Sequence, residues 1–379
     1  MPHPFFTYHG PISIDRVFKL LNKKVDISSN LEINDVKDLS SADQNSLTFL
    51  HSNKYKEIAK LTKASYCLTT NLLKDFLPKT CKPIIVENVL MATSIITSKI
   101  YPNSIEDIFD TKVKNIEQIN FKNNVKYGKN VLVGENVDIG SDCLIGHNTI
   151  IEKNVKIGNK CKIGSNTVIR NSIIKDNVSI LDNCVVGKKG FGFFPNKSQN
   201  LRYPHIGIVI INENCEIGSN TVIRNSFIKD NVSILDNCVI GKKGFGFFPN
   251  KSQNLRYPHI GIVIINENCE IGSGATIDRG SMSNTEIGKN TFLDNQVHIA
   301  HNVKIGENTI IAGQVGIAGS STIGNNVRIG GQAGISGHLK IGDNVDIAGG
   351  SGVIKDIPKN TKVMGYPAKN IREFLKENK

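Results

Sequence analysis

An aliphatic residue recurs at every sixth position through the last third of the chain, over twelve consecutive hexads. A period of six fits neither an α-helix nor an ordinary half-buried strand. It fits a three-sided coil, in which each side is a short strand with one inward aliphatic and each corner is a Gly, Ala, Asn or Asp. The series therefore predicts a parallel β-solenoid rather than the scattered strands of a β-sandwich. Its members are Ile287, Leu293, Ile299, Ile305, Ile311, Ile317, Ile323, Ile329, Ile335, Ile341, Ile347 and Val353.

The same phase occurs earlier, from Val133 through Ile139 and Ile145 to Ile169. Gly often follows the inward residue, and Asn or Asp fills many other corners. Both Asn and Asp tolerate left-handed backbone better than most residues. We therefore expect the hexapeptide solenoid to span residues 106–356.

The segments before and after the expected solenoid lack the six-residue period. In residues 1–105, a helix is expected after Ser13 and another over Tyr55–Leu61, with strands over 31–36, 65–69 and 83–86 and a helix over 91–99. These elements predict a compact α+β domain. Residues 357–379 contain an amphipathic stretch that ends near Glu377, and we expect it to form a helix that caps the exposed edge of the last coil.

A 54-residue segment occurs twice in tandem. Residues 166–219 recur as 220–273 and differ only where Ile173 becomes Phe227 and Val186 becomes Ile240. Each copy carries the interruption GKKGFGFFPNKSQNLRYPHIG, whose Gly and Pro content predicts a loop outside the coil. About six hexads then remain per copy, so the duplication should insert two whole coils and keep later faces in phase. Two coils lengthen the column by roughly 10 Å, since neighbouring strands lie about 4.8 Å apart.

Composition narrows the partners. The formal net charge of +12 favours an acidic protein or a nucleotide diphosphate. The Lys residues are spread through the hexads without aromatic clustering, which disfavours nucleic acid. Eight cysteines without a CxxC pair indicate a reducing, cytoplasmic compartment. No apolar run approaches membrane-spanning length and the N-terminus lacks a signal-peptide pattern, so a soluble protein is expected.

One ridge of the coil could carry chemistry. His301 lies two residues past inward Ile299, so it should project outward at a corner. Adding 18 reaches Gly319, and adding 36 reaches Gly337 beside His338, so these positions should stack in consecutive coils. Outward imidazoles beside bare glycine backbone suit a general base with an oxyanion-binding N–H. The alternative is a pair of surface histidines that only face water.

The other histidines are weaker candidates. His298, next to inward Ile299, is expected to be a bystander, and the loop copies His205 and His259 to be structural or at the fringe of a substrate. Zinc held by histidines of neighbouring subunits, as in γ-class carbonic anhydrases, is a further alternative. We disfavour it because no carboxylate is evident as a supporting ligand partner, and we expect no metal.

A series of motifs resembles one family over nearly the whole chain. The series comprises FLHSNKY from Phe49 to Tyr55, the GFGFFP loop, TIDRG, LDNQ, IAHN from Ile299, and the glycine-rich runs that end at Gly319 and His338. In this order the motifs resemble the UDP-3-O-acylglucosamine N-acyltransferases of lipid A biosynthesis, the LpxD family of hexapeptide-repeat acyltransferases. Single hexads are unspecific, whereas the ordered series is highly specific.

The resemblance implies a homotrimer of left-handed parallel β-helices with sites between subunits. It implies transfer of an (R)-3-hydroxyacyl chain from acyl carrier protein to the 2-amine of a UDP-3-O-acylglucosamine. The phosphopantetheine arm of the carrier holds the acyl group, and no separate cofactor is required. In this chain His301 would be the general base, Asp294 its support, Gly319 the oxyanion donor and His338 a contact for substrate or the phosphopantetheine arm. Phe49, Ser52 and Tyr55 would stand at the uridine site.

Two departures from the family change the expectations. Ser52 stands where the family often has Asn, which weakens the predicted polar contact with uracil. The extra unit lies between Phe49 and His301, so a fold-competent but catalytically impaired solenoid is the alternative function. A third expectation concerns the run Ala348–Gly352, which leaves the outward ridge without bulk and suggests a groove for a long acyl chain.

Overall fold

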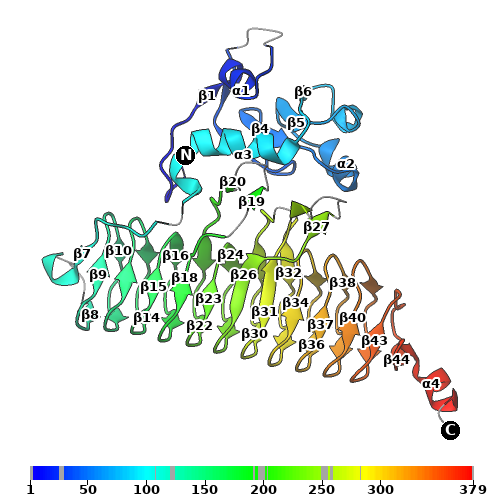
Figure 1. The fold of residues 1–379 in the computed structure, drawn as a ribbon. Coiled ribbons are helices and arrows are strands. Elements are labelled where there is room, and N and C mark those ends of the chain that lie inside the picture. Colours follow the sequence, from blue (N-terminus) through cyan, green and yellow to red (C-terminus); the bar gives the residue numbers. More distant parts are fainter. Residues whose placement is uncertain are drawn as a thin grey trace. The chain divides into compact units, whose positions relative to one another are not determined.

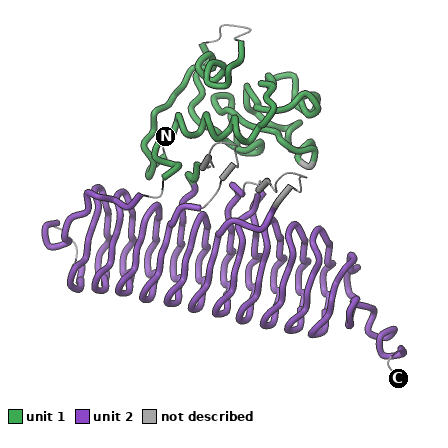
Figure 2. Tube along the Cα trace, in the orientation of Figure 1, with its two compact units in different colours: residues 1–107, 192–206 green, residues 108–191, 207–379 purple. Residues whose placement is uncertain are grey.

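The computed structural model describes residues 3–24, 30–106, 108–119, 124–190, 193–194, 201–202, 204–248, 255–256, 259–281 and 283–377. The chain forms two compact units (Figure 2). The first contains residues 1–107 and 192–206, and the second contains residues 108–191 and 207–379. The first unit thus includes part of the first long loop. The expected N-terminal domain, residues 1–105, did not include that part.

The first unit is an α+β fold around a four-stranded parallel sheet of order β3-β4-β5-β6 (Figure 1). The expected helix after Ser13 is present, and the Ser13 hydroxyl accepts the N–H of Arg16 as its N-cap. The strand that ends at Phe49 had no counterpart in the expected elements. The elements are β1 (Ile12–Ser13), α1 (Ile14–Leu20), β2 (Glu32–Ile33), β3 (Asp35–Val36), β4 (Ser46–Phe49), η1 (Asn53–Tyr55), α2 (Lys56–Ala59), β5 (Tyr66–Thr69), η2 (Lys74–Phe76), β6 (Lys82–Ile85), α3 (Val89–Ile100) and η3 (Pro102–Ser104).

The second unit is a solenoid with three faces, and each face is a sheet of mainly parallel strands. The chain passes through them in the order face 1, face 2, face 3. Face 1 contains β7 (Lys114–Asn115), β9 (Leu132–Val133), β12 (Ile150–Ile151), β15 (Val168–Ile169), β18 (Val185–Val186), β23 (Val222–Ile223), β26 (Val239–Lys243), β31 (Thr276–Arg279), β34 (His298–Ile299), β37 (Gly316–Ile317), β40 (Gly334–Ile335) and β43 (Gly352–Val353). Face 2 contains β10 (Asp138–Ile139), β13 (Lys156–Ile157), β16 (Ser172–Ile174), β21 (Val209–Ile211), β24 (Ser226–Ile228), β29 (Val263–Ile265), β32 (Thr285–Ile287), β35 (Lys304–Ile305), β38 (Thr322–Ile323) and β41 (Lys340–Ile341).

Face 3 completes each coil and runs from β8 to β45. It contains β8 (Lys126–Tyr127), β11 (Leu144–Ile145), β14 (Lys162–Ile163), β17 (Ser179–Ile180), β22 (Glu216–Ile217), β25 (Ser233–Ile234), β30 (Glu270–Ile271), β33 (Phe292–Leu293), β36 (Ile310–Ile311), β39 (Arg328–Ile329), β42 (Asp346–Ile347), β44 (Lys362–Met364) and β45 (Lys369–Asn370). Two hairpins, β19 (Phe193–Phe194) with β20 (Leu201–Arg202) and β27 (Phe247–Phe248) with β28 (Leu255–Arg256), stand on the two long loops. Outside the faces lie η4 (Ile116–Gln118) and α4 (Ile371–Glu377).

The inward ladder is the core of the solenoid. Each of the twelve predicted aliphatics from Ile287 to Val353 is no more than 4% exposed. Neighbouring coils pair in steps of 18, as Ile299 with Ile317. Corner Asn residues adopt positive φ and join side-chain amides along the axis, as Asn130 to Asn148 at 3.1 Å. The predicted parallel β-helix is therefore confirmed, while its left hand stays an expectation from the resemblance.

The duplication continues the solenoid in phase. On face 1, β15 and β18 belong to the first copy and β23 and β26 to the second. β18 pairs with β23, and β26 pairs with β31 beyond the second copy. Each copy therefore adds two coils, and the following coils keep their faces.

The C-terminal end differs from the expected boundary at residue 356. Strand pairing continues, because Ile357 bridges to Ile341 and Val363 pairs with Ile347. The spacing from Val353 to Ile357 is four residues instead of six, so the hexad pattern loses its phase although the coil goes on. The expected helix follows as α4. In the described part of the chain, no helix has the length and apolar character needed to cross a membrane.

The eight cysteines are free thiols and buried. Cys184 and its copy Cys238 pack inside the coil, and burial raises the pKa of each thiol to about 11. They act as small apolar side chains rather than as reactive groups.

Candidate active site

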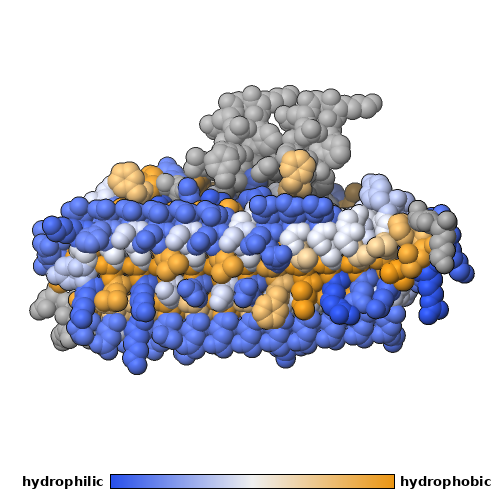
Figure 3. Space-filling view, turned by 90° about the horizontal axis from the view of Figure 1, so that it is seen from below, coloured by the Kyte–Doolittle hydropathy of each residue, from blue (hydrophilic) through white to orange (hydrophobic). Residues whose placement is uncertain are grey.

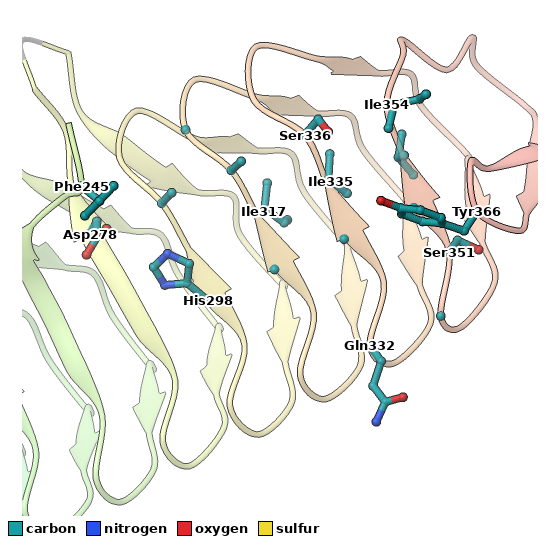
Figure 4. Close-up of a pocket in the computed structure, with 18 of the residues that line it drawn as sticks. Phe245, Asp278, His298, Ile317, Gln332, Ile335, Ser336, Ser351, Ile354 and Tyr366 are labelled. Carbon is teal, nitrogen blue, oxygen red and sulfur yellow. The ribbon is translucent and has the colours of Figure 1, made fainter. Parts of the chain in front are cut away.

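A groove of about 680 Å³ lies on the outer side of face 1, over the last coils. Its floor is the row of outward positions on successive strands, His298, Gly316, Gly334 and Gly352, which pair in register. A Cβ atom added at Gly316 or Gly334 would meet nothing within 4 Å, so these glycines leave the trough open. Figure 4 shows His298 at one end of this row and Tyr366 at the other.

Tyr366 corrects the expectation of an empty ridge at Ala348–Gly352. A Cβ atom on Gly352 would lie 1.8 Å from Cδ2 of Tyr366, so the ring rests directly on the glycine. The ring is itself 84% exposed. The space that Gly352 leaves is therefore already occupied, and Tyr366 closes this end of the groove.

His301 lies at the corner between faces 1 and 2, on the wall of the groove. Its Nδ1 is 3.0 Å from Oδ1 of Asn302. That oxygen also accepts the backbone N–H and the hydroxyl of Ser281, while the Asn302 amide nitrogen donates to the carbonyl of Ser283. Because the amide orientation is fixed in this way, Nδ1 of His301 must carry the proton. The neutral ring then presents the lone pair of Nε2, which is the form that a general base needs.

Gly319 stands in the next coil beside His301, as the 18-residue step predicts. The N–H of Ser320 donates to the carbonyl of His301, and the N–H of His338 donates to that of Gly319. A Cβ atom on Gly319 would lie 2.8 Å from Nε2 of His301, so only glycine lets the ring lie against this backbone. Among the described residues, no acceptor is present for the Gly319 N–H. His338 is exposed and lies outside the groove lining.

Asp294 is not brought to His301 within the chain. It follows β33 at the corner between faces 3 and 1, whereas His301 follows β34 at the opposite edge of face 1. The Asp294 carboxylate accepts the N–H of Asn295 at 2.7 Å. The partner that orients His301 in the chain is Asn302.

His298, which the sequence suggested to be a bystander, lines the groove floor. Its Nδ1 is 2.7 Å from the hydroxyl oxygen of Thr276 on the neighbouring strand. The sequence did contain a signal for a place in the groove. The next three outward positions of the same row, at steps of 18 residues from His298, are all glycine.

The second long loop closes over the site. The imidazole of His259 packs edge-to-face on His301, with ring centroids 4.9 Å apart and planes at 71°. The Arg279 side chain donates to the carbonyls of Ile260 and Gly261, at 2.7 and 2.6 Å. These bonds hold the C-terminal end of the loop against the coil. Neither contact is visible in the sequence, because the solenoid period does not fix where a loop returns.

Asp278 and Lys242 tie the base of the same loop to the coil. The Asp278 carboxylate is 1% exposed, lines the groove and lies 3.0 Å from the Lys242 ammonium. Phe245 extends from the loop beside Asp278 (Figure 4). In the part of the chain that is described, no group of three His, Cys, Asp or Glu residues is placed to hold a metal ion.

The expected uridine residues lie in the first unit. Phe49 ends β4 and is 2% exposed, whereas Ser52 and Tyr55 are half-buried. The Tyr55 ring lies 5.6 Å from that of His51, and burial lowers the pKa of His51 to about 4. The same unit has a polar cavity of about 750 Å³, lined among others by Asn34 and Lys63. The uridine role of the three residues stays a prediction.

Comparisons with known proteins agree with this architecture. Residues 30–98 match the family model described as UDP-3-O-(3-hydroxymyristoyl) glucosamine N-acyltransferase, LpxD. Residues 127–190 match a GMPPB C-terminal domain, and residues 284–319 match the bacterial transferase hexapeptide repeats.

Two similar curated proteins carry the same name. A UDP-3-O-acylglucosamine N-acyltransferase of Caulobacter vibrioides is 45% identical over 163 residues, which is 43% of this chain and 48% of that protein. One from Bradyrhizobium diazoefficiens is 46% identical over 90 residues, 24% of this chain and 25% of that protein. The chain therefore spans a quarter to about half the length of these relatives.

Solved structures with partial similarity to this chain include two UDP-N-acetylglucosamine acyltransferases. The one from Campylobacter jejuni is 22% identical, covers 65% of this chain and 73% of its own, and has a TM-score of 0.36. The one from Francisella novicida is 23% identical, covers 66% and 73%, and has a TM-score of 0.37. Similarity at this level does not bear on activity. Over part of its length the chain is therefore similar to the LpxD family model, to the hexapeptide-repeat model and to the named N-acyltransferases.

Proposed function

We propose that the chain is a UDP-3-O-acylglucosamine N-acyltransferase of lipid A biosynthesis that acts in the cytoplasm. It would move an (R)-3-hydroxyacyl group from acyl carrier protein to the 2-amine of the UDP-sugar. The observation that carries the proposal is the fixed tautomer of His301, whose Nδ1 is committed to Asn302 while Nε2 lies against the Gly319 backbone. The relatives' names supply the substrate class.

The reaction uses these groups in order. The sugar amine attacks the thioester carbonyl as Nε2 of His301 takes the amine proton, and the carbonyl oxygen becomes an oxyanion held by the Gly319 N–H. The C–S bond then breaks. The leaving thiolate of the phosphopantetheine arm takes the proton back from His301, which leaves an amide and a free thiol. The proton on Nδ1 of His301 stays in the hydrogen bond to Asn302 throughout the reaction.

The proposal includes a homotrimer, as the resemblance implies, and the outer side of face 1 in the first coils supports an interface between subunits. There the outward row is aliphatic and half-buried in the single chain: Leu132, Ile150, Val168, Val185, Val222 and Val239. Figure 3 shows, on the side of the solenoid seen from below, an apolar band that runs between hydrophilic rows. A long apolar stripe indicates an interface between subunits. In a trimer, Asp294 and His338 of a neighbouring subunit would be the ones that approach the groove. Light scattering of the purified protein tests this, and a monomer would contradict it.

The activity is tested directly. Purified protein is incubated with (R)-3-hydroxyacyl carrier protein and UDP-3-O-(3-hydroxyacyl)glucosamine, and the amide product is measured by mass spectrometry. His301→Ala should lower kcat by about 10²- to 10⁴-fold, the usual contribution of a general base. His147→Ala, which removes another corner imidazole of the solenoid, serves as the control. Full transfer by the His301 variant would refute its role, and no transfer by the unaltered chain would favour the impaired solenoid.

A further inference from the structure

The long loop of the second copy places a second imidazole against the proposed base. His259 is 2% exposed, and its ring meets that of His301 edge-to-face with centroids 4.9 Å apart. Gly244 of the same loop fills the angle between the two rings. A Cβ atom there would lie 2.8 Å from Cβ of His301 and 2.9 Å from Nε2 of His259. We infer that His259 is a positioning residue that fixes the ring of His301.

The physical need for such a residue is clear from the contacts of His301. Its side chain is hydrogen-bonded through Nδ1 to Asn302, so the ring can still pivot about that bond. A pivot would move Nε2 away from the Gly319 backbone, against which the ring lies. The His259 ring and the Gly244 backbone also lie against the His301 side chain, and edge-to-face aromatic contacts of this kind are favourable. A displacement of even 1 Å at a reacting atom costs heavily in rate.

His259 can act as a wall because the chain just after it is held rigidly. The N–H groups of Ile260 and Gly261 donate to the carbonyl of Ser281, at 2.7 and 2.9 Å. Arg279, which is 3% exposed, donates to the carbonyls of the same two residues. Both groups of partners belong to the coil that precedes His301.

Among the described residues, the charged groups on β26 and β31 near His301 have partners of their own. Lys242 on β26 and Asp278 on β31 pair with each other, and Arg279 on β31 is committed to the loop carbonyls. His301 follows β34, and the next coil presents only Gly319 at this place. His259 is therefore the titratable side chain whose ring contacts the base.

The first copy supplies a matched control. His205 has the same loop sequence around it, yet its N–H donates to the carbonyl of Ser104 in the first unit. β23 pairs with β26 as β31 pairs with β34, so the position equivalent to His301 beside the first loop is Lys242. A change at His205 therefore removes the same side chain without touching the base.

The inference rests on the proposed function, so its test needs a readout besides turnover. The variants are His259→Ala, His259→Phe, which keeps an aromatic edge without a titrating group, and His205→Ala. The first readout is the reaction of His301 with diethylpyrocarbonate, followed by peptide mass spectrometry. His259→Ala should speed modification of His301 several-fold, whereas the other two variants should leave it near the unaltered rate.

The second readout is transfer kinetics. His259→Ala should lower kcat by about 10- to 100-fold with KM nearly unchanged, because ring placement and not substrate binding is lost. His259→Phe should restore most of kcat and keep the shape of the pH–rate profile, because the Phe ring replaces the aromatic edge that holds His301. Equal effects of His259→Ala and His205→Ala in both readouts would overturn the inference, as would a Phe variant as impaired as the Ala variant. If the unaltered chain shows no transfer, the proposed function fails, while the modification rates still decide the role of His259.

Discussion

The two copies of the 54-residue segment differ at two positions, yet their loops dock in different surroundings. The first loop returns to the N-terminal unit, where the His205 N–H donates to Ser104 and the Ile206 backbone bonds to His3. The second loop returns over the candidate site and packs His259 on His301. An almost identical sequence therefore contributes to two different places.

The cause is the coil that follows each loop. Beside the first loop the strand positions after Ile223 are Arg224 and Asn225, and Oδ1 of Asn225 lies 2.2 Å from the place of a Cβ atom on Gly207. Beside the second loop the equivalent positions after Ile277 are Asp278 and Arg279. The Arg279 guanidinium reaches the loop carbonyls, which the shorter Asn225 cannot do in the same way. A duplicated loop takes its role from its neighbours rather than from its own residues.

The substitution expected to have the largest effect on this contrast is Arg279→Asn. It places beside the second loop the residue type that stands beside the first loop at Asn225. Two hydrogen bonds from a buried cation are lost, so the free energy of unfolding should fall by about 2–4 kcal/mol. Transfer should fall by about 100-fold, because the wall against His301 is released. Hydrogen exchange at residues 259–262 and urea unfolding measure the two effects. Asn225→Ala is the control and should spare both exchange at these residues and transfer.

A smaller effect is expected when the outward row of the coils under the groove is made like that of the two copies. The copies carry valine on face 1, as at Val222, where the groove has Gly334. Gly334→Val should leave the melting temperature unchanged, since a Cβ atom there meets nothing within 4 Å. It should lower transfer of long acyl chains by about tenfold while sparing short ones. Val222→Gly, the reverse change outside the groove, is the control, and equal loss for all chain lengths would contradict an acyl groove.

The fold was predictable from the sequence to the extent that contacts are local and periodic. The six-residue period gives the faces, the inward ladder and the in-phase insertion, because each coil contacts mainly its neighbours. The C-terminal coil escaped because the step from Val353 to Ile357 omits two residues. The parallel strand that ends at Phe49 escaped because Ser46 and Thr48 are polar although buried, so only Leu47 and Phe49 mark it as apolar.

The site was predictable only along the axis of the coil. The 18-residue step placed His301 beside Gly319 without any coordinates. It could not place His259, Arg279 or Tyr366, because a loop or a C-terminal segment that leaves the coil also leaves the period. The role of Asn302 was equally hidden, since it depends on which atoms of Ser281 and Ser283 face its amide.

Lowering the pH should destabilise the first loop and leave the second loop unaffected. Burial lowers the pKa of His3 from 6.5 to about 4, although its bond to the Ile206 backbone acts in the opposite direction. The folded unit thus prefers neutral His3, and the stability that this gives is present above pH 6.5 and lost as the pH falls toward 4. The loss is on the order of 3 kcal/mol for this group. Hydrogen exchange, corrected for intrinsic rates, should rise at residues 204–206 but not at 259–262, and His3→Asn should reduce the difference.

The smallest effect is expected from removing one copy altogether. Deletion of residues 166–219 or of 220–273 gives two products that differ only at the positions of Ile173/Phe227 and Val186/Ile240. In both, the single loop is followed by the coil with Arg279, so it should dock over His301 as the second loop does now. We expect unchanged modification of His301 by diethylpyrocarbonate and transfer within a few-fold of the intact chain. Transfer by the shortened forms alone would instead show that two extra coils, roughly 10 Å of added length, impair the enzyme. A loop that docks elsewhere in the shortened chain would mean that the neighbouring coil does not determine its place.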